Sequence, residues 1–61
     1  MFYYRIQYRL KSDHLDLTAE LMIYAQSDEA AAEKAAAQLQ HSYPECSVTI
    51  KNVTQITFGY F

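Results

Sequence analysis

Residues 2–11 read FYYRIQYRLK, and apolar and polar side chains alternate along the whole of this stretch. A period of two residues is typical of a β-strand with one buried face. The buried face would be formed by Phe2, Tyr4, Ile6, Tyr8 and Leu10. The opposite face would be formed by Tyr3, Arg5, Gln7, Arg9 and Lys11. The pattern therefore predicts a first strand with one apolar face and one cationic face.

A second alternating segment follows closely and predicts a hairpin. The residues 12–14, Ser-Asp-His, have turn chemistry, and apolar residues then recur at every second position from Leu17 to Ala25. If the apolar faces of the two strands match, Arg9 lies near Thr18 or Glu20. By the same matching, Arg5 lies near Met22 or Tyr24.

The next segment has the signals of a helix. Ser27 is the expected N-cap, and the acidic residues at 28 and 29 complement the helix dipole. An alanine-rich stretch continues to about Ser42, and Pro44 stops the helix. A helical wheel places Lys34 on the solvent side, together with Gln38 and His41. The stripe predicted to face the sheet consists of Ala32, Ala35, Ala36, Leu39 and Tyr43.

Alternation returns after the proline, and it leaves two arrangements open. Apolar residues occupy the even positions Cys46, Val48, Ile50, Ile56, Phe58 and Tyr60, with an interruption at Asn52 and Thr54. One arrangement is a single long strand that is bent or bulged near Asn52. The other is a pair of short strands joined around residues 51–54. The shared parity favours the single bent strand.

These elements predict an α+β domain with the order β-β-α-β over residues 1–61. A crossover helix makes the second and third strands parallel, and right-handed connection leaves the first strand between them. The sheet order is then 2-1-3 with antiparallel neighbours, and the helix covers one face only. No motif in the sequence identifies a particular family.

Size and composition limit what such a chain can do. Its 61 residues allow one small core, and the formal net charge is −2. No apolar run approaches the length that spans a bilayer, and the first residues lack a signal-peptide layout, so we expect a mature cytoplasmic protein without membrane association. The single cysteine, Cys46, agrees with a reducing compartment and is expected to be a buried thiol.

Catalytic and metal chemistry lack a suitable set of residues. Cys46 is predicted to point inward, away from both histidines, so no nucleophile has a base beside it. The one compact group of metal-ligand types, residues 13, 14 and 16, is explained by turn polarity. A single glycine, Gly59, excludes a glycine-rich phosphate loop. We therefore expect no enzyme activity, no metal and no cofactor.

The exposed sheet face is the remaining candidate for function. Four of the five basic residues share one parity with Tyr3, and two further aromatic residues are expected on this face or at its rim. The candidate interaction surface consists of Tyr3, Arg5, Arg9, Lys11, Tyr24, Lys51 and Phe61.

Two functions fit this surface. The preferred one is a protein-interaction module that forms a homodimer or docks another protein through the exposed face or an edge strand, because aromatic residues with arginine make good interface anchors. The alternative is binding of single-stranded nucleic acid by cations and stacked rings. Asp16 and Glu20 on the same face, and the acidic chain, oppose that alternative. An ordinary solvated face, or a small inhibitor of a larger protein, also fits the sequence.

Overall fold

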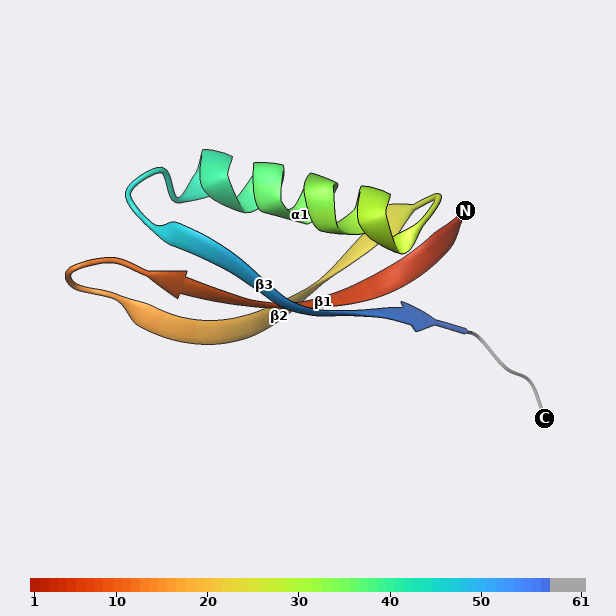
Figure 1. Cartoon of the computed structure of the whole chain (residues 1–61), viewed down its shortest axis with the longest axis horizontal. Coiled ribbons are helices and arrows are strands. Elements are labelled where there is room, and N and C mark those ends of the chain that lie inside the picture. The colour runs from red at the N-terminus through yellow and green to blue at the C-terminus, as the bar shows by residue number, and fades with distance from the viewer. Residues whose placement is uncertain (58–61) are drawn as a thin grey trace.

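The computed structural model describes residues 1–57 and has the expected α+β architecture. The elements in chain order are β1 (Phe2–Lys11), β2 (Asp16–Ala25), α1 (Asp28–Ser42) and β3 (Ser47–Ile56). The strands form an antiparallel sheet in the order β2-β1-β3, so the predicted topology is confirmed. Figure 1 shows α1 along one side of the twisted sheet, and we call the opposite side the open face.

The hairpin between β1 and β2 has the register predicted from the apolar pattern. Ten consecutive pairs run from the start of β1 to its end, and Arg9 lies opposite Thr18 as expected. Beyond the last pair, the Ser12 N–H donates to the Leu15 carbonyl at 2.7 Å. The Ser12 hydroxyl also accepts from the His14 N–H at 3.3 Å. Polar residues with turn chemistry therefore close the hairpin.

Both ends of α1 are defined by local hydrogen bonds. The Ser27 hydroxyl accepts from the Ala30 N–H at 3.1 Å, and Ser27 itself has extended backbone angles, so the predicted N-cap is confirmed. At the other end, the Tyr43 N–H donates to the Leu39 carbonyl at 2.8 Å. The side chain of Gln40 then donates to carbonyl groups in the turn that leads to β3.

Replacing the N-cap tests this description of the helix start. We expect Ser27→Ala to lower the free energy of unfolding by about 1 kcal/mol, because an N–H of the first turn loses its acceptor. Urea denaturation followed by circular dichroism measures the change. Ser42→Ala, at the exposed last residue of α1, is the control and should change the stability by less than about 0.5 kcal/mol. Equal losses in the two variants would contradict a capping role for Ser27.

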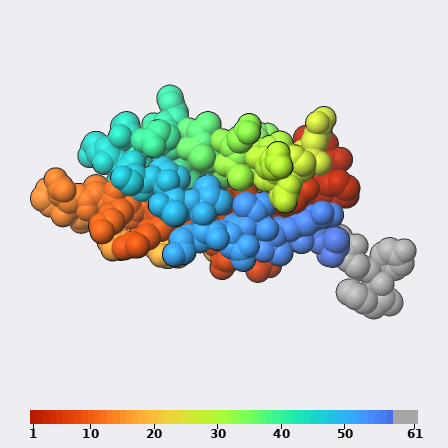
Figure 2. Space-filling view, viewed as in Figure 1, coloured from red at the N-terminus to blue at the C-terminus, as the bar shows by residue number. Residues whose placement is uncertain are grey.

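The core lies between α1 and the sheet, and Figure 2 shows the two layers in close contact. The helix buries Ala31, Ala35 and Leu39. The predicted stripe is thus wrong in part: Ala32 and Ala36 are half-buried, and Ala31 is the residue that sequence reasoning missed. Tyr43 is also exposed, because as the C-cap residue it has left the helical conformation.

The last strand is single and irregular, as the preferred arrangement predicted. Its register changes from Ile50 opposite Tyr8 to Asn52 opposite Gln7, so Lys51 is an extra residue without a pairing position in β1. Such a bulge reverses the parity of everything after it. Val53 now faces the helix side and packs against the core.

The reversal corrects two expectations. Ile56 was predicted to share the helix side with Ile50, but it lies opposite Tyr3 on the open face. Lys51 was assigned to the cationic face by parity, but as the bulged residue it has no pairing position in β1 that would fix its face. The same parity was extended to Phe58 and Tyr60, which lie outside the described residues 1–57.

The helix is too short to cover its side of the sheet. Its 15 residues extend about 22 Å, whereas strands of 10 residues extend about 33 Å. Phe2 and Leu17 were predicted to be buried but are exposed, and Ala19 and Leu21 are only half-buried. Apolar side chains at the strand ends, and others along the middle of the edge strand β2, therefore reach solvent. Within residues 1–57 the structure contains no helix with the length and apolar character needed to cross a bilayer.

Candidate interaction surface on the open sheet face

The open face divides into two regions with different chemistry. Near the hairpin turn lies a charged region formed by Arg9, Lys11 and Asp16. At the other end of the sheet lies an apolar region that we call the aromatic patch. The aromatic patch consists of Tyr3 from β1, Met22 and Tyr24 from β2, and Ile56 from β3.

Charges in the first region are largely paired within the chain. The Arg9 guanidinium donates two hydrogen bonds to Asp16, from Nε to Oδ1 at 2.8 Å and from Nη2 to Oδ2 at 2.7 Å. The side chain of Gln7 donates to Glu20 Oε2 at 2.9 Å. The hydrogen bond from Arg9 holds the pKa of Asp16 below its ordinary value, and the same contact raises the pKa of Arg9.

The face is consequently less basic than the sequence pattern indicated. On β1 and β2 it has three cations, Arg5, Arg9 and Lys11, against two carboxylates, Asp16 and Glu20, which leaves a balance of +1. Arg9 already has a bidentate partner, and an exposed ion pair of this kind is screened by water. A phosphate backbone would have to compete with these carboxylates, so the charge arrangement does not favour nucleic acid binding.

The Arg9–Asp16 pair gives a pH-dependent prediction. Because the folded-state pKa of Asp16 is lowered, its carboxylate stabilises the fold above the unfolded-state pKa of about 4, and this contribution disappears as the pH falls through the folded-state pKa. We expect the wild type to lose more stability than Asp16→Asn between about pH 5 and pH 2. Urea midpoints measured across this range give the comparison. Parallel pH profiles for the two proteins would contradict the assignment.

The aromatic patch is uncovered and continuous across the sheet. The rings of Tyr3 and Tyr24, which face each other in the register, have centroids 4.7 Å apart and planes tilted by 45°. Tyr3 is 43% exposed, Tyr24 46% and Met22 55%. Ring pairs of this kind present large apolar areas with polar hydroxyl tips, which suits a protein contact surface.

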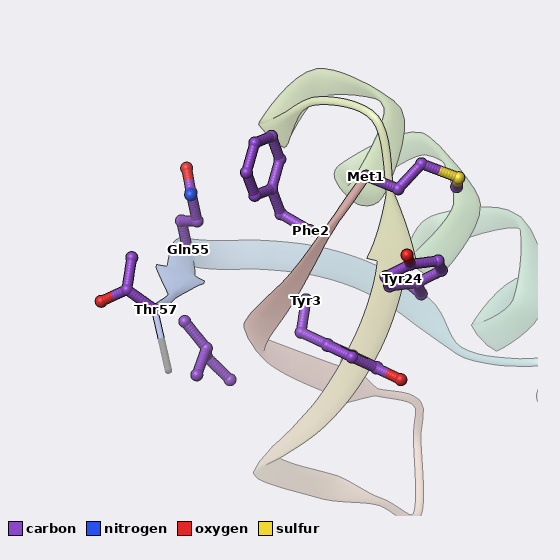
Figure 3. Close-up of a pocket in the computed structure, with 7 residues that line it drawn as sticks. Met1, Phe2, Tyr3, Tyr24, Gln55 and Thr57 are labelled. Atoms are coloured by element: carbon purple, nitrogen blue, oxygen red, sulfur yellow. The ribbon is translucent and has the colours of Figure 1, made fainter. Parts of the chain in front are cut away.

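A shallow hollow of about 420 Å³ lies at the outer end of the aromatic patch. Figure 3 shows the side chains of Gln55 and Thr57 on one side of it and those of Met1 and Tyr24 on the other. The hollow is open to solvent, whereas sites for small molecules usually enclose most of the ligand. Its apolar walls are better suited to a side chain from another protein.

The structure separates the residues predicted for the interaction surface. Tyr3 and Tyr24 are in ring contact, and Arg5 lies opposite Met22 at the boundary of the aromatic patch. Arg9 and Lys11 lie in the charged region. Lys51 lies in the bulge of β3, and Phe61 is outside the described residues.

Sequence reasoning gave Met22 little weight and assigned Ile56 to the wrong face. The alternation of residues 17–25 already placed Met22 beside Tyr24. No periodic signal could place Ile56, because the bulge reset the alternation before it.

The side chains that commonly bind metal ions are dispersed in the part of the chain that the structure describes. Residues 1–57 contain no group of three metal-ligating side chains close enough to share an ion. Asp16, one member of the compact group in the hairpin, is bonded to Arg9. Comparisons with protein-family models, curated proteins and solved structures found no match to this chain.

Proposed function

We propose that this chain is a non-enzymatic, cytoplasmic protein-interaction module that self-associates and uses the aromatic patch as an apolar contact surface. The observation that carries the proposal is the row of Tyr3, Tyr24 and Met22, each about half exposed and adjacent on a face that no element covers in residues 1–57. A contiguous exposed apolar patch typically marks a protein contact. The cytoplasmic assignment is supported by the single unpaired cysteine, Cys46.

The thin core supports association independently of the aromatic patch. Ile6 and Leu10 are the largest side chains that the described residues bury completely. Domains of this size bury only about 60% of the surface that the unfolded chain exposes, so their stability is marginal. Contact with a second copy would remove further apolar area from water and add stability by mass action.

The solution mass tests this proposal. Light scattering over a concentration series, at low and moderate salt, should show a dimer at high concentration. The dimer should be insensitive to salt, because apolar and backbone contacts are not screened by ions. A mass that stays at one chain throughout the concentration series would contradict self-association. A dimer that dissociates when salt is added would instead indicate contacts through the charged region.

A further inference from the structure

We propose that the β2 edge pairs with the β2 edge of a second copy, antiparallel and through residues Asp16–Met22, so that two sheets join into one of six strands. The inference rests on the proposed function for its premise that copies associate.

The two edges of the sheet formed by residues 1–57 differ in how well they resist pairing. The β3 edge is interrupted by the bulge at Lys51, and both bulges and lysines discourage edge-to-edge contact. β2, in contrast, pairs with β1 in ten consecutive steps and contains no lysine and no proline. A long regular edge without a bulge, a lysine or a proline is a template for another strand, provided that its charges, here Asp16 and Glu20, are not opposed to like charges.

Backbone geometry shows which groups of β2 face outward. In an antiparallel pair, residues alternate between hydrogen-bonded and non-bonded positions. The hydrogen bond from the Ser12 N–H to the Leu15 carbonyl marks that pair as a hydrogen-bonded one. Every second pair after it is hydrogen-bonded too, so the odd residues of β2 direct their backbone groups toward β1. The backbone groups of Asp16, Thr18, Glu20 and Met22 then point to the outer edge.

Lys34 limits the part of the β2 edge that can pair with another strand. Its Nζ donates to the Tyr24 carbonyl at 3.3 Å, which agrees with an outward direction for that carbonyl. The side chain of a helix lysine thus covers the edge at Tyr24. The uncovered part of the edge extends from Asp16 to Met22.

The same segment also lacks apolar cover on the helix side. Leu17 is 37% exposed, and Ala19 and Leu21 are half-buried, whereas Ile23 and Ala25 further along β2 are buried. Backbone groups and apolar side chains therefore reach solvent along one stretch. A further strand with apolar residues at alternate positions would hydrogen-bond to these backbone groups and cover these apolar side chains.

A second copy of β2 is such a strand, and the whole segment Asp16–Met22 pairs with itself when Ala19 lies at the centre. With Ala19 opposite Ala19 of the second copy, Thr18 faces Glu20, Asp16 faces Met22 and Leu17 faces Leu21. No like charges are then directly opposed. In a register centred on Glu20, the Glu20 carboxylates of the two copies would face each other. In a register centred on Thr18, Asp16 would face Glu20. A register centred beyond Glu20 would need pairing at Tyr24, where Lys34 covers the edge.

The two-fold arrangement closes with two copies, and it brings the β2 members of the aromatic patch, Met22 and Tyr24, to the contact. Met22 would lie opposite Asp16 of the second copy. Tyr24 would lie beside the hairpin turn of that copy. Leu17 of each copy would contact Leu21 of the other on the helix side of the joined sheet.

Cross-linking tests the register directly. In a Cys46→Ser background, Ala19→Cys should form a disulfide-linked dimer under mild oxidation, because non-bonded antiparallel partners have Cα atoms about 4.5 Å apart. Thr18→Cys is the control: in this register its opposite residue is Glu20, so it should cross-link much more slowly. Fast linkage of Thr18→Cys with little linkage of Ala19→Cys would overturn the register.

A proline at the edge tests the pairing without a cross-link. The Thr18 N–H points outward, so Thr18→Pro should retain the β1–β2 pairing and block the second copy. We expect its dissociation constant to rise at least about tenfold, with a circular dichroism spectrum like that of the wild type. Gln55→Pro, at an outward position on β3, is the matched control and should stay dimeric.

The outcomes separate this inference from the proposed function. A dimeric wild type in which Ala19→Cys does not cross-link, or in which Thr18→Pro associates normally, would overturn the β2 pairing and leave the proposed function standing. A monomeric wild type at every concentration would overturn both. If Thr18→Pro unfolds, the cross-linking comparison still decides.

Discussion

Ile6→Ala is expected to unfold a large part of the population at room temperature. Ile6 has no exposed surface, lies on the central strand and pairs with Leu21 on one side and Val53 on the other. Truncating a buried isoleucine to alanine costs about 2–5 kcal/mol, through lost apolar contact and the cavity that remains. A core in a domain of this size supplies only about 3–5 kcal/mol.

Ile56→Ala is the matched control for this prediction. It makes the same chemical change on the same sheet, but on the open face and outside the core. Urea denaturation at low protein concentration should give a loss of less than about 1 kcal/mol, because the residue is only partly buried. Equal losses of unfolding free energy in the two variants would mean that Ile56 is a core residue, as an unbroken alternation would require. The assignment of a bulge at Lys51 would then be wrong.

Tyr24→Ser is expected to weaken association of the copies about tenfold, which corresponds to about 1.4 kcal/mol. The substitution removes one ring of the Tyr3–Tyr24 pair and the apolar area that the aromatic patch presents at the β2 edge. The dissociation constant can be obtained from sedimentation equilibrium. Thermal unfolding of the same sample shows whether the variant is still folded.

Tyr43→Ser provides a control with the same residue type and nearly the same exposure. Tyr43 is 44% exposed against 46% for Tyr24, but it caps the end of α1 away from the open face. Its substitution should leave the dissociation constant unchanged. If both serine variants weaken association equally, the aromatic patch has no special part in the contact.

The sequence was sufficient to predict the topology because its strongest local signals agreed with the connection rules. Strict alternation in residues 2–11 fixed the first strand, and Ser27 fixed the helix start, as the hydrogen bond to Ala30 shows. The right-handed crossover then required β1 to lie between the other strands. Long, regular and well-capped elements are the ones that such reasoning can place.

The bulge was the main feature that parity could not place in the correct position. An extra residue changes the face of every later side chain, so Ile50 and Ile56 share parity but not a face. The apolar residue Val53, at an odd position between them, was the one available signal. Tertiary contact with Ile6 gives Val53 its place, and a local pattern contains no information about that contact.

The sequence predicted which aromatic residues share the open face, but it did not predict which charged side chains pair with each other. Alternation correctly brought Tyr3 and Tyr24 to one face. The register places Thr18 opposite Arg9, but the Arg9 guanidinium bonds to the diagonal neighbour Asp16. Diagonal partners depend on sheet twist and side-chain reach, which a linear pattern does not specify.

Amide hydrogen exchange at two protein concentrations reports on pairing through the β2 edge residue by residue. If copies pair through this edge, the Thr18 and Glu20 amides should be protected at high concentration and lose that protection on dilution. The outward amides of β3, such as that of Val48, should exchange rapidly at both concentrations. Rapid exchange of Thr18 and Glu20 at a concentration where the protein is dimeric would contradict pairing through β2.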